Sequence, residues 1–280
     1  MIIFKHTADL QKYLTGHNIP DRKIGFVPTM GALHAGHGSL IAASKKDNDI
    51  TIVSIFVNPL QFNNPQDLVK YPVTLEKDIV FLLSLGVEIL FLPDVEEIYP
   101  EQTMTEKMYN LNGLDAVYEG AFRPGHFQGV CRVMDRLLNI VLPGQLYLGQ
   151  KDFQQVMVIR KLISLLDLPV NIIIGSTIRE QNGLAMSSRN LRLTPSQFEK
   201  ASIIYKELNW IKENRHSSKF SELKEKAVQV LKNNGMKTEY LALCNASDLF
   251  ALEDFDDSVP MALLIAVFCG EVRLIDNLLL

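Results

Sequence analysis

The sequence predicts an α/β protein in which a doubly wound parallel sheet is followed by a smaller α+β domain. Short apolar runs without polar alternation, typical of strands covered on both faces, recur through the first two-thirds of the chain. Helical patterns separate these runs. An alternation of strand and helix favours right-handed βαβ units and therefore a parallel sheet.

The expected strands of the first domain span residues 24–28, 50–57, 89–92, 145–149 and 170–174. Helices are expected between them at residues 39–46, 74–85, 129–141 and 152–166. Ligands of such sheets bind beyond the carboxyl ends of the strands. The loops that directly follow the strands are therefore the places to look for chemistry.

The last third of the chain has a different pattern. Thr194 followed by Pro195 predicts a capped helix start, and a second helix over residues 220–234 is expected to end at Gly235. Strands are expected at residues 238–243, 262–268 and 272–275, the last two joined as a hairpin. We divide the chain into domains 1–184 and 185–280, and expect the second to close over the active site.

Composition excludes several classes of protein. The chain has 280 residues, 47% hydrophobic and 21% charged, which is typical of a globular protein. A net charge of -4 argues against a dedicated nucleic-acid surface, so no nucleic-acid partner is expected. The most apolar stretch, residues 79–92, is shorter than the roughly 20 residues that span a bilayer, so no membrane association is expected.

The cysteines indicate a reducing compartment. Cys131, Cys244 and Cys269 are odd in number and far apart, so they form neither a disulfide framework nor a metal-binding pair. We expect them to be small buried side chains of a cytoplasmic protein.

The loop after the first of these strands, PTMGALHAGHGSL at residues 28–40, carries the strongest candidate for nucleotide binding. Its glycines let the backbone approach a bulky ligand, and a helix beginning near Gly36 offers N–H groups and a positive dipole end. His34 and His37, three residues apart, should project to the same side and can donate hydrogen bonds to a phosphate. Alternatively, the two histidines could be half of a metal site or incidental loop residues. The sequence shows no cluster of Cys, His or Asp that would supply the remaining metal ligands.

Two later loops complete the pattern. Lys151 follows the strand at 145–149 and places a cation at the positive end of a helix, which is unfavourable unless a polyphosphate binds there; a solvated surface lysine is the alternative. In the third loop Ser187, Ser188 and Arg189 supply hydroxyls and a guanidinium suited to phosphate oxygens, although helix capping would also explain the serines. The H-x-G-H string resembles the signature of class I aminoacyl-tRNA synthetases and nucleotidylyltransferases, and the third loop resembles their mobile phosphate loop.

Neutral amides are the candidates for substrate selection. Asn58 and Gln61 follow the second of the expected strands, and Gln155 lies one turn beyond Lys151. Buried amides reject analogues that lack the matching oxygens, since their own polar groups would be left unpaired. The loop with Arg123 and His126 could meet a carboxylate or a phosphate. Ordinary surface positions remain the alternative for the amides.

Together these segments resemble the pantothenate synthetase (pantoate–β-alanine ligase) family. The matching strings, in family order, are PTMGALHAGH, FVNPLQF, RPGHFQGV, LGQKDFQQ, GLAMSSRN and RLIDN. The resemblance implies a Rossmann-like first domain, a homodimer, and condensation of pantoate with β-alanine through pantoyl adenylate. ATP would be the co-substrate, Mg²⁺ would accompany it, and AMP and pyrophosphate would be released.

The resemblance also implies roles for individual residues. The catalytic residues would be His37, His34 and Lys151, with no protein metal ligand. Gln61 and Gln155 would match the pantoate-binding glutamines, with Gln61 also near the β-alanine position. From the residues themselves we also expect Asn58, Arg123 and His126 to bind substrate. The nucleotide-binding set would be Pro28, Thr29, Met30, Gly31, Ala32, Leu33, His34, His37, Gly149, Gln150, Lys151, Asp152, Ile178, Met186, Ser187, Ser188 and Arg189. This chain departs from the family pattern at Val73, where arginine is usual, and at Asn182, where aspartate is common.

Two rival functions share parts of this pattern. A nucleotidylyltransferase would use the same H-x-G-H loop but leave the nucleotide on its product, and it does not account for the second domain or the paired glutamines. A nucleotide-sensing regulator on the same fold would bind ATP without releasing pyrophosphate.

Overall fold

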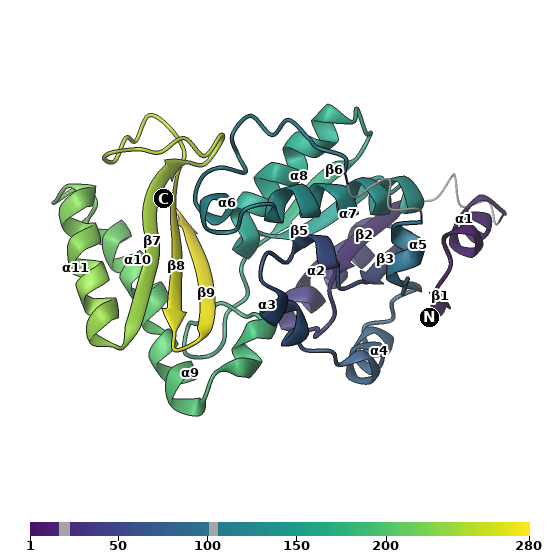
Figure 1. The fold of residues 1–280 in the computed structure, drawn as a ribbon, viewed down its shortest axis with the longest axis horizontal. Coiled ribbons are helices and arrows are strands. Elements are labelled where there is room, and N and C mark those ends of the chain that lie inside the picture. Colours follow the sequence, from purple (N-terminus) through teal and green to yellow (C-terminus); the bar gives the residue numbers. More distant parts are fainter. Residues whose placement is uncertain (17–22, 101–105) are drawn as a thin grey trace. The chain divides into compact units, whose positions relative to one another are not determined.

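The structure, a computed structural model, describes residues 1–16, 23–100 and 106–280. The chain divides into two compact units, drawn in Figure 1. The first comprises Met1–Gly149 and Gln155–Ser176, and the second comprises Gln150–Gln154 and Thr177–Leu280. Residues 150–154 therefore belong to the second unit, although both of their flanking segments belong to the first. Residues 177–184, placed before the expected domain boundary, also lie in the second unit.

The first unit is built on a six-stranded sheet in which every strand pairing is parallel among the described residues. Its strands, in sheet order, are β1 (Ile2–Phe4), β4 (Ile89–Phe91), β3 (Ile50–Ile55), β2 (Ile24–Thr29), β5 (Gln145–Gly149) and β6 (Asn171–Gly175). The predicted doubly wound sheet and its five expected strands are confirmed. Strand β1 was not predicted, because three residues carry too short a pattern and its pairing with β4 is what defines it.

The order of the strands locates the switch point, where the winding of the sheet reverses. From β2 the sheet continues through β3 and β4 in one direction, whereas β5 and β6 lie on the other side of β2. The winding therefore reverses between β2 and β5, which pair directly at Gly25–Gln145 and Phe26–Leu146. Crevices at such reversals are where doubly wound sheets bind ligands. The loops with the histidine pair and with Lys151 begin at the carboxyl ends of these two neighbouring strands.

Helices cover both faces of the sheet, as Figure 1 shows. On one face α1 (Thr7–Gly16), α7 (His126–Val141) and α8 (Phe153–Leu165) share a core with β2–β5. On the other face α2 (Ala35–Asp47) and α4 (Leu75–Ser84) pack over Val27, Val53 and Tyr147. All six residues of β3 are buried, which explains why its sequence lacks polar alternation.

Short elements fill the connections of the first unit. They are the 3-10 turn η2 (Pro59–Gln61) and the helices α3 (Pro65–Val69), α5 (Val95–Ile98) and α6 (Glu119–Phe122). The sequence did not predict them, since three to five residues are too few for a periodic pattern.

The second unit is a three-stranded antiparallel sheet with helices packed against it. Its strands are β7 (Met236–Asn245), β8 (Met261–Cys269) and β9 (Val272–Leu279), and its helices are α9 (Pro195–Ala201), α10 (Ile203–Asn214) and α11 (Phe220–Asn233). Thr194 caps α9 through a capping box with Gln197, as its sequence predicts. The hairpin from β8 to β9 turns at Gly270, which has a φ of 61°.

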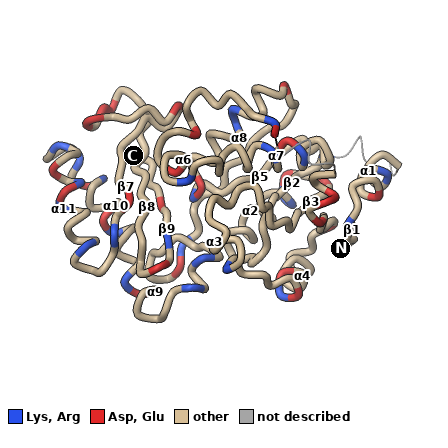
Figure 2. Tube along the Cα trace, viewed as in Figure 1, with Lys and Arg blue, Asp and Glu red and all other residues tan. Residues whose placement is uncertain are grey.

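All three cysteines are buried and free, and burial raises the pKa of the Cys131 thiol to about 12, which makes it unreactive. Within residues 1–16, 23–100 and 106–280, no helix is long and apolar enough to cross a membrane. Acidic and basic residues alternate along α11 in Figure 2, as expected for a solvated helix face.

Candidate active site

The histidine pair lies at the start of α2, directly beyond β2. His34 is the N-cap residue, and its Nδ1 accepts a hydrogen bond from the Gly36 N–H at 3.1 Å. His37 Nδ1 in turn accepts from the His34 N–H at 3.3 Å, so the two imidazoles form a capping box in place of the usual serine and glutamate. Their ring centroids are 4.2 Å apart, which confirms that both project to the same side of the first turn.

This capping arrangement fixes the chemistry of both rings. An Nδ1 that accepts a hydrogen bond carries no proton, so a neutral ring must carry its proton on Nε2. Both histidines therefore present an Nε2–H as their donor. A pair of N–H donors beside a helix N-terminus is suited to phosphate oxygens.

Gly36 is required for this geometry. A Cβ at that position would lie 2.9 Å from both Cε1 and Nδ1 of His34. Real Cβ atoms do not come so close, so a side chain there would displace the His34 ring from the helix start. The glycine of H-x-G-H thus makes room for the first histidine.

A buried carboxylate, which the sequence analysis missed, holds the backbone before the histidines. Asp78 of α4 is 3% exposed, and its two carboxylate oxygens accept from the N–H groups of Ala32 at 2.9 Å and Leu33 at 2.8 Å. Thr74 Oγ1 donates to the same carboxylate at 3.1 Å. Ala32 has a φ of 49°, unusual for a residue with a Cβ, and these bonds help to hold it there. Sequence offered no signal, because an aspartate near a helix start is ordinary.

The second cluster surrounds η2, after β3. Asn58 is 1% exposed; its Nδ2 donates to Gln61 Oε1 and to the Gly129 carbonyl, each at 3.1 Å. Its Oδ1 accepts from the Tyr99 hydroxyl at 2.9 Å. Gln61 is 8% exposed, and its Nε2 donates to Met30 Sδ at 3.0 Å, which joins this cluster to the loop after β2. Both amides are thus buried and fixed, so the surface-residue alternative is wrong for them.

Arg123 and His126 belong to the same cluster. His126 is 5% exposed, and its ring nitrogens contact the Gln61 carbonyl (Nδ1, 2.8 Å) and Arg123 Nη1 (Nε2, 3.1 Å). Since a carbonyl only accepts and a guanidinium only donates, His126 is neutral, with its proton on Nδ1. Glu119 Oε2 lies 3.6 Å from Arg123 Nη1. His126 therefore connects a guanidinium to the backbone of the η2 turn.

The loop with Lys151 is a single 3-10 turn, η4 (Gln150–Asp152), between β5 and α8. The Lys151 side chain is only 16% exposed, and its Nζ lies 3.5 Å from Asp152 Oδ1. A freely solvated surface lysine does not fit this burial. Gln155, half-buried on the first turn of α8, belongs to the first unit.

The third loop extends from a tight hairpin in the second unit. The predicted turn at Asn182-Gly183 is confirmed: Gly183 has a φ of 96°, and Arg179 pairs with Ala185 across it. Asn182 Nδ2 donates to the Phe198 carbonyl at 3.0 Å, a bond that the family's aspartate could not make. The backbone N–H of Met186 donates to the Ile178 carbonyl at 2.9 Å, so these two predicted residues are neighbours.

The segment with the two serines and Arg189 continues into the 3-10 turn η5 (Ser188–Arg192). Ser187 caps η5 by accepting from the Arg189 N–H at 3.3 Å, so the capping alternative holds for this serine. The same hydroxyl can still donate its own hydrogen, so capping and phosphate binding are compatible.

The predicted residues are thus shared between the two units. The first unit holds the loop after β2, Gly149, the η2 cluster and Gln155, and the second holds residues 150–152, Ile178 and the segment 186–189. In the described part of the chain, no group of three or more His, Cys, Asp or Glu side chains is arranged to hold a metal ion.

A doubly wound sheet with paired N–H donors at the N-terminus of the helix after β2, beside the switch point, defines a nucleotide-binding α/β protein. The family model described as Pantoate-beta-alanine ligase matches residues 2–279. The chain belongs to the pantoate–β-alanine ligase family.

Individual relatives are similar over their whole lengths. A pantothenate synthetase from Azobacteroides pseudotrichonymphae is 45% identical over 280 residues, covering 99% of each protein. One from Bacteroides thetaiotaomicron is 43% identical, covering 98% of this chain and 97% of the relative.

Solved structures agree with the fold. The pantothenate synthetase of Thermus thermophilus has a TM-score of 0.91 at 38% identity and 99% coverage of both chains. The pantoate-beta-alanine ligase of Francisella tularensis, complexed with beta-gamma ATP and beta-alanine, has a TM-score of 0.84 at 40% identity, covering 100% of this chain and 97% of that chain.

Proposed function

We propose that this chain is an ATP-dependent ligase that condenses pantoate with β-alanine to pantothenate through pantoyl adenylate. The observation that carries the proposal is the histidine-capped helix start at the sheet's switch point, in a chain that matches the ligase family from residue 2 to residue 279. ATP is the co-substrate, and the amide cluster around η2 supplies the neutral polar groups that a hydroxy acid requires.

In the first step a pantoate carboxylate oxygen attacks the α-phosphorus, and the bond from that phosphorus to the bridging oxygen of pyrophosphate breaks. Negative charge on the non-bridging oxygens increases in the transition state. The Nε2–H groups of His34 and His37 are proposed to donate to these oxygens, together with backbone N–H groups at the start of α2. Donors that capping has already oriented need no reorganisation during the reaction.

The departing pyrophosphate needs its own donors. We assign Lys151, Ser187, Ser188 and Arg189 to its oxygens, since each carries a cation or a hydroxyl group and all four lie in loops of one unit. Mg²⁺ is proposed to be carried by the nucleotide, where it would neutralise triphosphate charge. Mg²⁺ typically binds substrate phosphates and water with few protein ligands.

Pantoate is proposed to be held by Gln61 and Gln155, with Arg123 and His126 beside Gln61. The expected direct contact of Asn58 with pantoate is replaced by a positioning role, because its amide group is buried and bonded to Gln61, Gly129 and Tyr99. The amide hydrogens and oxygens of the two glutamines match the hydroxyl and carboxylate groups of the acid. In the second step the uncharged amine of β-alanine attacks the acyl carbon of the adenylate. The carbon–oxygen bond to AMP breaks, AMP leaves with the bonding electrons, and the new amide nitrogen loses a proton.

Water must be kept from the adenylate, because it would hydrolyse the mixed anhydride. We propose that the second domain, assigned to residues 185–280, closes over the first for this purpose. We further propose a homodimer in the cytoplasm. The roles assigned to individual residues above do not depend on the homodimer or on the cytoplasmic location.

The deciding experiment is ATP–pyrophosphate exchange with purified protein, with pantoate present and no amine. The ligase mechanism requires exchange that depends on pantoate, because adenylate formation is reversible before β-alanine enters. No pantoate-dependent exchange would contradict the adenylate intermediate. Free AMP should appear only when β-alanine is added; nucleotide retained on the product would indicate a nucleotidylyltransferase, and ATP binding without pyrophosphate release would indicate a regulator.

A further inference from the structure

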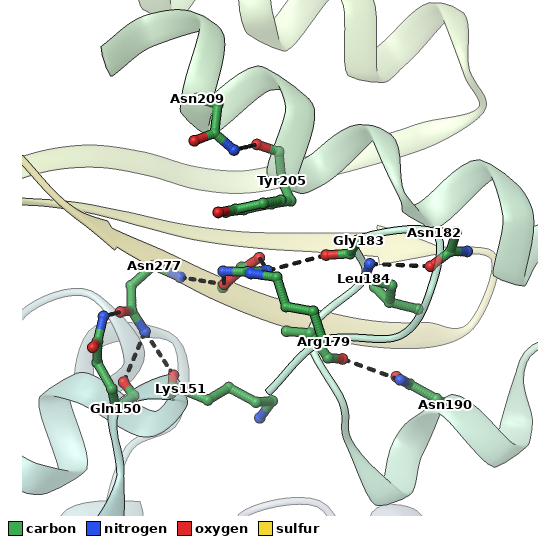
Figure 3. Close-up of polar contacts among 12 residues, drawn as sticks. Gln150, Lys151, Arg179, Asn182, Gly183, Leu184, Asn190, Tyr205, Asn209 and Asn277 are labelled. Carbon is green, nitrogen blue, oxygen red and sulfur yellow. Dashed lines mark hydrogen bonds and ion pairs between the residues drawn. The ribbon is translucent and has the colours of Figure 1, made fainter. Parts of the chain in front are cut away.

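The RLIDN segment on β9 ends in two buried polar residues that the proposed mechanism does not use. Asp276 is 5% exposed and Asn277 is 2% exposed. Polar groups so deeply buried lower stability unless they are fully hydrogen-bonded, so their partners indicate what they are for. We call Asn277, Asp276, Gln150 and Arg179 the β9 network. Figure 3 labels Asn277, Gln150 and Arg179.

Asn277 binds the turn that carries Lys151. Its Nδ2 donates to the main-chain carbonyls of Gln150 and Lys151, each at 2.9 Å, and its Oδ1 accepts from Gln150 Nε2 at 3.1 Å. Both amide hydrogens and the amide oxygen are therefore used. Asparagine and glutamine alone combine these donors and acceptors on one side chain, and the longer glutamine would not fit the same distances.

Asp276 binds the hairpin that leads to residues 186–189, which we call the serine–arginine loop. Arg179 donates to both of its carboxylate oxygens, at 2.7 and 3.0 Å, and also to the Gly183 carbonyl at 3.2 Å. The guanidinium carbon lies 3.4 Å from the centre of the Tyr205 ring, so the planar group is held on its face as well as at its edge. Arg179 begins the turn whose far side continues into residues 186–189.

The two anchors share one strand and are coupled directly. The Asn277 N–H donates to Asp276 Oδ1 at 2.8 Å, the same oxygen that accepts from Arg179 Nη2. Consecutive side chains of a strand point to opposite faces, which allows two adjacent residues to hold two different loops. The turn with Lys151 and the hairpin that leads to residues 186–189 are thus attached to adjacent residues of β9.

We propose that Asn277 is a positioning residue for Lys151, and that the β9 network holds Lys151 and the 186–189 loop as one rigid phosphate-binding group. Lys151 then moves with the second unit, although residues 149 and 155 on either side belong to the first. The inference rests on the proposed role of Lys151 at the departing pyrophosphate. A misplacement of about 1 Å can lower a rate roughly a hundredfold, so the anchor matters although it touches no substrate.

A double-mutant cycle on pantoate-dependent ATP–pyrophosphate exchange tests this. Asn277→Ala should lower kcat for exchange by about tenfold or more, because Lys151 loses its fixed position. In a Lys151→Ala background, the same substitution should lower kcat by less than about twofold, since its effect passes through the missing amine. Effects that simply multiply would mean that Asn277 acts independently of Lys151 and would overturn the proposal, as would unchanged exchange in Asn277→Ala.

A second variant covers loss of folding. Asn277→Asp keeps the size of the side chain and the oxygen that accepts from Gln150. It replaces the NH₂ group with a second oxygen, which cannot donate to the carbonyls of Gln150 and Lys151. Hydrogen exchange of the peptide covering residues 149–154, without substrates, should be faster in this variant than in wild type. Protection equal to wild type would contradict the anchor.

Asn234→Ala is the matched control, because Asn234 Nδ2 also donates to a main-chain carbonyl, that of Val230 at 2.9 Å, at the end of α11. It should leave both measurements unchanged. If wild-type protein shows no pantoate-dependent exchange, the proposed function fails, and the hydrogen-exchange result still decides whether Asn277 anchors the turn.

Discussion

The protonation of the two nitrogens in each imidazole of His34 and His37 determines which hydrogen-bond donors lie at the start of α2. Because each Nδ1 accepts a backbone N–H, the donor of each neutral ring is Nε2, and the ring cannot turn without uncapping the helix. An aspartate would cap the helix equally well but carries no donor, and a capping serine could donate only through a much shorter side chain. Histidine at these two positions therefore combines capping with a second hydrogen-bond donor.

His37→Ala should lower pantoate-dependent exchange about a hundred- to thousandfold, since one donor to a charge that develops in the transition state contributes roughly 3–4 kcal/mol. Loss of the cap should lower stability by only about 1 kcal/mol, so the protein should remain folded by circular dichroism. His216→Ala, on an exposed side chain, is the control. Near-wild-type exchange would remove His37 from the mechanism.

Asp78 contacts the backbone of the loop after β2. Asp78→Asn replaces one acceptor with an NH₂ group that faces N–H groups of the loop, so one of Ala32 or Leu33 loses its bond. An unsatisfied buried donor lowers stability by about 1–3 kcal/mol. We expect this loss in urea unfolding, together with a higher KM for ATP. Glu76→Gln, exposed on the same helix, should change neither; an unchanged KM for ATP in Asp78→Asn would show that the loop does not depend on this carboxylate.

At the scale of elements, close packing of α7 on η2 shapes the amide cluster. A Cβ on Gly129 would lie 2.1 Å from the Leu60 carbonyl oxygen, so any side chain there forces helix and turn apart. The Gly129 carbonyl also accepts from Asn58, so the same contact sets the position of the amides. The family string RPGHFQGV contains this glycine, and its packing role is visible only once α7 and η2 are placed together.

Gly129→Ala should therefore lower thermal stability and raise KM for pantoate more than KM for ATP, because the displaced turn carries Asn58 and Gln61. Overpacking of this kind typically lowers stability by about 1–3 kcal/mol. Gly16→Ala is the control: a Cβ there meets nothing within 4 Å. Equal changes in the two KM values would argue that the turn does not bind pantoate.

At the scale of the whole molecule, each unit has its own hydrophobic core. A carboxyl group buried in the second unit, that of Glu207, makes the stability of the protein depend on pH. Glu207 of α10 is 9% exposed, and burial raises the pKa of its carboxyl group. The folded state therefore binds this proton more tightly than the unfolded chain does. Stability is unaffected by Glu207 below the unfolded pKa of about 4.3 and falls as pH rises through the higher folded pKa.

Glu207→Gln should consequently raise the Tm at pH 7, and the gain should vanish near pH 4. Thermal unfolding at several pH values measures this. Glu213→Gln makes the same change at an exposed position of the same helix and serves as the comparison. A gain at pH 7 that persists unchanged at pH 4 would attribute it to packing rather than to the charge.

The sequence by itself determined much of the fold. Strands buried on both faces carry unbroken apolar runs, helix ends carry caps and glycines, and these local signals located β2–β6 and the helices α2, α4, α7 and α8. Local signals also placed both histidines on one side of the α2 start and the turn at Asn182-Gly183. The strings at the strand ends further indicated the ligase family, because binding residues lie in loops at the carboxyl ends of strands.

Tertiary structure alone decided the rest, because it depends on residues far apart in the chain. Asp78 reaches Ala32 across 46 positions, and Asn277 reaches Gln150 across 127. Strand β1 exists by pairing with β4, and residues 150–154 belong to the second unit through β9. Hydrogen bonds between distant segments leave no periodic trace in sequence, since the partners are brought together only when the strands take their order.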